Sequence, residues 1–95
     1  MNSESLRELI RRAIVEDRLP RSGNKPRIFG SLGEGILCAV CHVTIPPTAI
    51  QYDVDCKLGE VSHTLSMHRL CFQVWESESR ALHGIAGHSV CEDAA

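Results

Sequence analysis

The sequence predicts a small α+β domain in which a β-hairpin lies between two helices. Apolar residues recur at helical spacing in residues 5–18 and again in residues 67–82. Apolar and polar residues alternate at strand spacing in residues 50–54 and 61–67. The chain has 95 residues, of which 43% are hydrophobic and only 4% aromatic, so its core is thin. Domains of this size often depend on a metal ion or on disulfides.

Residues 1–20 are expected to form an N-terminal amphipathic helix that ends before Pro20. The spacing i, i+3, i+4, i+7, i+8 gathers one apolar stripe, made of Leu6, Leu9, Ile10, Ala13 and Ile14. Stripes of this kind usually pack on the body of the protein. A helix that binds a partner or dimerises is the alternative interpretation.

Residues 21–35 are rich in glycine, proline and serine, which predicts a loop. Ile28 and Phe29 are expected to attach this loop to the core. The segment GSLGEG lacks the spacing of a phosphate-binding loop, so a flexible turn is the preferred interpretation.

Residues 36–83 are expected to form the central domain. A short apolar strand carries a cysteine pair, Pro46 and Pro47 break the chain, and the hairpin follows. Helical spacing predicts a helix over residues 67–82, capped by Ser66 and bearing a Glu76–Arg80 pair four residues apart. Residues 84–95 are expected to be a flexible C-terminal tail.

Four residues in this domain have the spacing of zinc ligands: Cys38-x2-Cys41-x26-His68-x2-Cys71. Zinc prefers four sulfur or nitrogen donors at tetrahedral corners. Two intervening residues let a tight turn present both sulfurs of the first pair, and the first turn of a helix presents the second pair on one face. We therefore expect one zinc ion bound by Cys38, Cys41, His68 and Cys71. With all four positions filled by protein donors, this zinc is expected to be structural and no catalytic residues are predicted.

Other uses of these side chains stay open at this stage. His88-x2-Cys91 repeats the second spacing, and His63 is a substitute for His68. The segment CAVCH also matches a c-type haem attachment site with His42 as axial ligand, although that leaves the second ligand pair unexplained. Cys56, near the predicted hairpin tip, is expected to be a free thiol.

The order of cysteine knuckle, hairpin and ligand-bearing helix resembles the treble-clef zinc fingers. Cys38, Cys41, His68 and Cys71 carry this resemblance, together with Trp75 one turn after the last ligand. With the leading segment LRELIRRAIVEDRLP, the chain is also similar to small uncharacterised bacterial zinc-finger-like proteins. The resemblance implies a zinc-stabilised fold, and it assigns no activity.

Charge and hydropathy limit the classes of function. Residues 1–27 hold seven Lys and Arg against four Asp and Glu, whereas the remainder holds three against eight. An acidic body disfavours DNA as a partner. No secretory signal is recognised, and no run of about 18 apolar residues exists, so we expect a cytoplasmic protein without a membrane segment.

The favoured function is a non-enzymatic adaptor that binds another protein through its N-terminal helix. The alternatives are a nucleic-acid-binding finger with a basic N-terminal arm and a thiol or zinc redox sensor. The sequence does not predict an oligomeric state.

Overall fold

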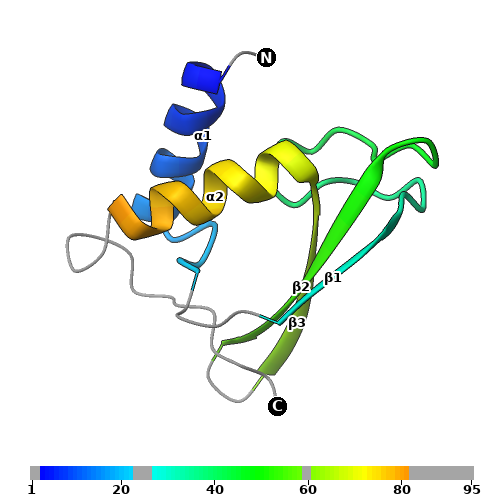
Figure 1. Cartoon of the computed structure of the whole chain (residues 1–95). Coiled ribbons are helices and arrows are strands. Elements are labelled where there is room, and N and C mark those ends of the chain that lie inside the picture. The colour runs from blue at the N-terminus through cyan, green and yellow to red at the C-terminus, as the bar shows by residue number, and fades with distance from the viewer. Residues whose placement is uncertain (1–2, 23–26, 59–60, 82–95) are drawn as a thin grey trace.

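The computed structural model describes residues 3–22, 27–58 and 61–81, which form two helices and a three-stranded antiparallel sheet (Figure 1). The elements follow in the order α1 (Ser3–Val15), β1 (Arg27–Leu32), β2 (Ile50–Leu58), β3 (Val61–His68) and α2 (Arg69–Ala81). The α2 helix lies across one face of the sheet, and α1 packs on α2 (Figure 1). The predicted α+β class is therefore confirmed.

The apolar stripe of α1 is used inside the molecule. Four of its side chains are at most 5% exposed, namely Leu6, Ile10, Ala13 and Ile14. On the facing helix, the carboxylate of Glu78 accepts hydrogen bonds from Nε and Nη2 of Arg11, at 3.2 and 3.0 Å. The expectation that the stripe packs on the body is confirmed.

Trp75 joins α2 to the segment that follows α1. Its side chain is completely buried, and its indole N–H donates to the carbonyl oxygen of Pro20 at 2.8 Å. Its ring lies 6.1 Å from that of Phe72, which in turn meets the ring of Tyr52 on β2 edge to face at 5.0 Å. This aromatic row connects both helical segments to the sheet with very few large side chains.

The strand β1 lies where the sequence predicted a loop. It pairs with β2 from Arg27↔Asp55 to Leu32↔Ile50. Gly30 and Ser31 weaken its strand signal, and the pairing partner lies more than 15 residues away, so local patterning does not reveal it. Ile28 packs against the core as expected, but Phe29 is 54% exposed and does not.

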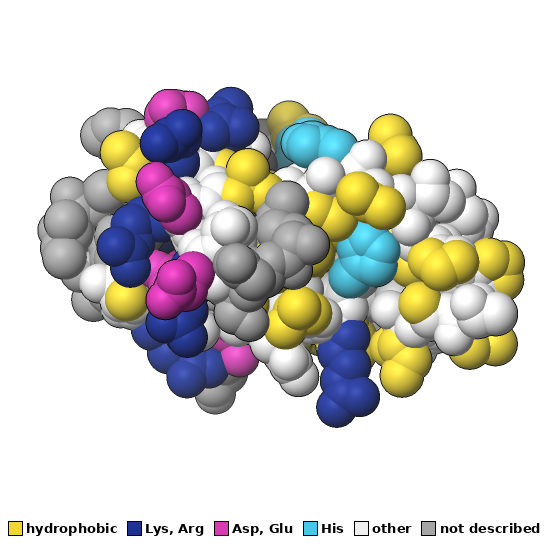
Figure 2. Space-filling model, turned by 90° about the horizontal axis from the view of Figure 1, so that it is seen from above, with side chains coloured by type: hydrophobic (Ala, Val, Ile, Leu, Met, Phe, Trp, Pro, Cys, Tyr) yellow, Lys and Arg dark blue, Asp and Glu magenta, His cyan; other side chains and the backbone are white. Residues whose placement is uncertain are grey.

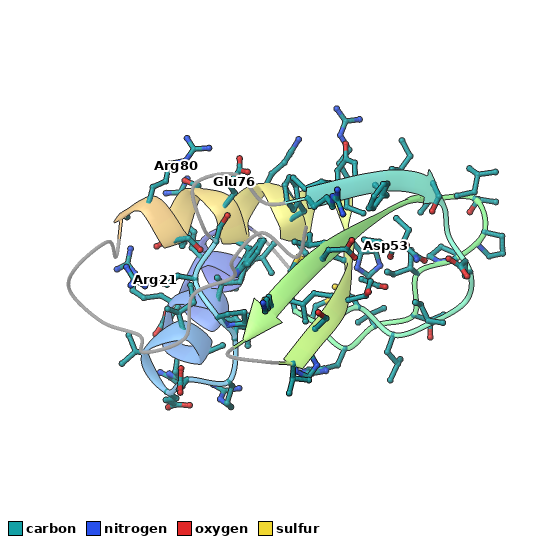
Figure 3. The ribbon with its side chains drawn as sticks, turned by 90° about the horizontal axis from the view of Figure 1, so that it is seen from below. Arg21, Asp53, Glu76 and Arg80 are labelled. Carbon is teal, nitrogen blue, oxygen red and sulfur yellow. The ribbon has the colours of Figure 1, made fainter. Side chains whose placement is uncertain are left out.

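The border between β3 and α2 falls two residues later than predicted. Met67 and His68 still pair with β2, and the helix begins at Arg69. Ser66 is therefore not a helix cap; its hydroxyl donates to the carboxylate of Asp53 at 2.7 Å. The predicted Glu76–Arg80 pair is present at 2.8 Å on the exposed side of α2 (Figure 3).

The state of the Cys56 sulfur differs from the prediction made from the sequence. It is disulfide-bonded and completely buried on β2, so the prediction of a free thiol is wrong. Within the described ranges, no helix has the length and apolar character needed to cross a bilayer.

Candidate metal centre

The first ligand pair lies on a tight reversal of the chain between Leu37 and Thr44, which form an isolated antiparallel bridge. The backbone N–H of Cys38 donates to the carbonyl oxygen of Val43, and the backbone N–H of His42 donates to the carbonyl oxygen of Cys38, both at 3.0 Å. His42 has φ of 61°, in the left-handed region that residues other than glycine adopt uncommonly, although histidine does so more often than most. This conformation reverses the chain directly after Cys41 and brings both cysteines to the inner side of the turn.

The second ligand pair lies at the junction of β3 and α2. His68 is the last residue of the strand, and Cys71 is in the first turn of the helix. The amide of Ala39 donates to the carbonyl oxygen of Ser66 at 2.7 Å, which holds the first turn against the end of β3. Backbone hydrogen bonds thus help to bring together two segments that are 27 residues apart.

These four side chains form one cluster. One donor atom from each of Cys38, Cys41, His68 and Cys71 lies within 4.8 Å of all the others. The Nδ1 atom of His68 is 3.4 Å from the sulfur of Cys41 and 3.9 Å from that of Cys71. A tetrahedral zinc ion with bonds of about 2.0–2.3 Å requires donor separations of about 3.5–3.8 Å. The four residues are therefore positioned to hold a metal ion, and their donor set is consistent with zinc.

The cluster is arranged to carry negative charge. The pKa of the Cys38 thiol is lowered, first because the Cys71 thiol donates to its sulfur and then because nearby backbone N–H groups do so, while burial opposes the shift. One of these donors is the amide of Val40, 3.4 Å from the Cys38 sulfur. The pKa of Cys71 is raised by the same thiol pair and by burial. A metal cation that replaces the proton shared by Cys38 and Cys71 would leave both sulfurs as thiolates, which is the chemistry of a thiolate metal site.

A network beside the cluster was not predicted from the sequence. Gln51, completely buried, lies opposite His68 in the strand register. Its side-chain amide donates to Asp53 at 2.8 Å and to the carboxylate of Glu34 at 3.2 Å, and its oxygen accepts the amide of Glu34 at 3.1 Å. Asp53, labelled on the sheet in Figure 3, also accepts the hydroxyl of Ser66. The network fixes the segment that enters the first ligand turn relative to the strands that carry His68.

The structure also separates alternative ligands from the cluster. His63 is exposed on β3, paired with Cys56 and five residues before His68. His42 is exposed after the turn and is not among the clustered donors. The sulfurs of Cys38 and Cys41 share one centre with His68 and Cys71, which favours a metal ion over a haem. The alternative pair, His88 and Cys91, lies outside the described residues.

Comparisons of the chain with protein-family models, with curated proteins and with solved structures found no match. The geometry therefore defines the class: a small α+β domain with a Cys3His cluster suited to a metal ion.

Proposed function

We propose that this protein is a non-enzymatic protein-interaction module whose fold is stabilised by one structural zinc ion. The observation that carries the proposal is the closed donor set of Cys38, Cys41, His68 and Cys71. Four protein donors fill a tetrahedral zinc ion and leave no position for a substrate. Two ligands, Cys38 and Cys71, are at most 5% exposed, so the ion would become part of the core.

The proposal includes a treble-clef arrangement around the ion. In support, the ligand turn, the β2–β3 hairpin and the ligand-bearing α2 follow in the order typical of that group. In such small folds, metal binding supplies folding free energy that the apolar core does not.

A protein partner is preferred to nucleic acid because several arginines of the N-terminal arm are already paired with carboxylates. Arg11 pairs with Glu78, Arg12 with Glu8 and Arg18 with Glu16 at 2.7–3.5 Å. Binding to phosphates requires cations that are free to replace counterions. The proposed contact through α1 would use this charged outer surface, since the apolar stripe is buried against α2.

The proposed compartment is the cytoplasm, where the three ligand cysteines would stay reduced and available to the metal. The disulfide of Cys56 is the feature that favours an oxidising compartment instead. Intact mass measured after alkylation of freshly lysed cells, with and without reductant, distinguishes the two.

Elemental analysis of the purified protein tests the central claim. One zinc per chain, with an ultraviolet–visible spectrum that lacks a haem Soret band, is the expected result. A chain that is folded and free of metal would contradict the proposal. Fluorescence anisotropy with duplex and single-stranded oligonucleotides, at low and moderate salt, should show no binding; tight and strongly salt-dependent binding would favour the nucleic-acid alternative.

A further inference from the structure

An apolar surface lies at the ligand-turn end of the molecule. Residues 35–52 contain no Asp, Glu, Lys or Arg, although such residues make up 23% of the chain. Five large apolar side chains at this end are 42–68% exposed: Leu32, Ile36, Leu37, Val43 and Ile50. We call these five side chains the apolar end patch. Figure 2 shows hydrophobic side chains gathered over one end of this face and most of the Lys, Arg, Asp and Glu side chains over the other.

The patch is built on one continuous ribbon. Leu32 pairs with Ile50 at the end of the β1–β2 ladder. The hydrogen bonds continue from Gly33 to Ala49, and from Ile45 to Ile36, until Leu37 bridges Thr44. Leu32 and Leu37 are five residues apart along this ribbon, which corresponds to at most about 17 Å of chain. The five side chains are therefore carried by one hydrogen-bonded ribbon and not by separate loops.

The size of the patch suggests an interface. At on the order of 100 Å² each, the five side chains expose roughly 500 Å², which is near the upper limit for the largest apolar patch on a typical monomer. Contact between two such patches would bury at most roughly 1,000 Å², the lower bound for a specific interface. A contact of this size is reversible and depends on concentration.

We infer that the apolar end patch is where a second copy of this chain binds, in a two-fold symmetric dimer. This inference goes beyond the proposed function, because it adds a second contact surface to the proposed contact through α1, and it rests on the zinc-stabilised fold that holds the ligand turn in place. A two-fold contact places each patch against itself, which requires a self-complementary surface. The five side chains meet this requirement because they are apolar, and the exposed carboxylate of Glu34, which lies between Leu32 and Ile36 on the ribbon, already accepts the side-chain amide of Gln51.

Sedimentation equilibrium of the zinc-loaded protein, from about 1 µM to about 1 mM, tests the inference. We expect a monomer–dimer equilibrium in the wild type. Leu32→Glu and Leu37→Glu should each raise the dissociation constant at least tenfold, since each buries a charge at the contact. Val61→Glu is the matched control: Val61 is 56% exposed, but it lies at the opposite end of the hairpin and should leave the constant unchanged.

Two side chains on different parts of the ribbon keep the test valid if one variant fails to fold. Mixed samples of isotope-labelled and unlabelled protein should also give intermolecular NOEs that involve methyl groups of the patch. A wild type that stays monomeric up to about 1 mM, or a Val61→Glu variant weakened as much as the others, overturns the inference. Zinc is measured in each sample: a monomer with one zinc refutes only the dimer, whereas a folded chain without zinc refutes the proposed function.

Discussion

Replacing Cys71 by serine is the strongest perturbation of the proposed metal centre. The Cys71 side chain is 5% exposed, and its sulfur lies 3.9 Å from Nδ1 of His68, so the variant removes one donor from the interior of the cluster. Structural zinc in small folds contributes on the order of 10 kcal/mol or more. A domain of this length has a net stability of about 5–14 kcal/mol. Loss of the metal is therefore comparable to the whole stability, and the variant should be largely unfolded at 25 °C.

Circular dichroism and the fluorescence of Trp75 measure this outcome together. Trp75 is completely buried, so unfolding should shift its emission to longer wavelength while the helical signal falls. Adding a strong chelator to the wild type should reproduce both changes. His68→Cys is the matched control, because four thiolates also bind zinc tetrahedrally and the fold should persist. If Cys71→Ser melted cooperatively within about 5 °C of the wild type without bound metal, the zinc contribution would be below about 1 kcal/mol and our reasoning would be wrong.

Three further predictions concern the ion pair, the close backbone approach and the protons of the site. Glu78→Ala should lower the free energy of unfolding by about 1–2 kcal/mol, because the Glu78 side chain is 5% exposed while its arginine partners stay hydrated. Thermal melting should show a lower melting temperature, with a smaller decrease at high salt. An unchanged melting temperature would contradict this prediction. Gly33→Ala would place a Cβ 2.0 Å from the carbonyl oxygen of Pro46 and should cost about 1–3 kcal/mol in urea unfolding. Gly30→Ala, whose nearest contact is a tyrosine ring carbon at 3.3 Å, is the control, and equal losses would count against the argument. Zinc affinity should fall about a thousandfold for each pH unit below the thiol pKa values, because three protons compete with the metal for the three sulfurs. The thiols regain ordinary pKa values if the metal-free chain is unfolded. A competition assay with a chelator at several pH values measures the slope of the logarithm of zinc affinity against pH, for which we expect a value of about three. A slope of two would show that Cys38 keeps its lowered pKa in a cluster that stays folded without metal.

The ligand set follows from the sequence because each half of it is local. Two residues between Cys38 and Cys41 suit a turn, and two between His68 and Cys71 suit the start of a helix, whatever surrounds them. The apolar stripe of α1 and the hairpin follow from short-range periodicity in the same way. The exact border before α2 does not, because His68 satisfies both the end of a strand and the start of a helix.

Only the tertiary structure assigns what depends on distant partners. The strand β1 exists because residues 27–32 find β2. The side chain of the buried Gln51 is satisfied only when the fold brings Glu34, 17 residues away, next to it. Whether an apolar residue is buried is also decided by its neighbours in space, which is why Ile10 is hidden while Leu37 is 62% exposed. Spacing along the chain determines which groups can bind a metal ion, because that choice depends on chemistry and short turns. Long-range pairing determines which groups remain exposed for a partner, because burial is a property of the assembled chain.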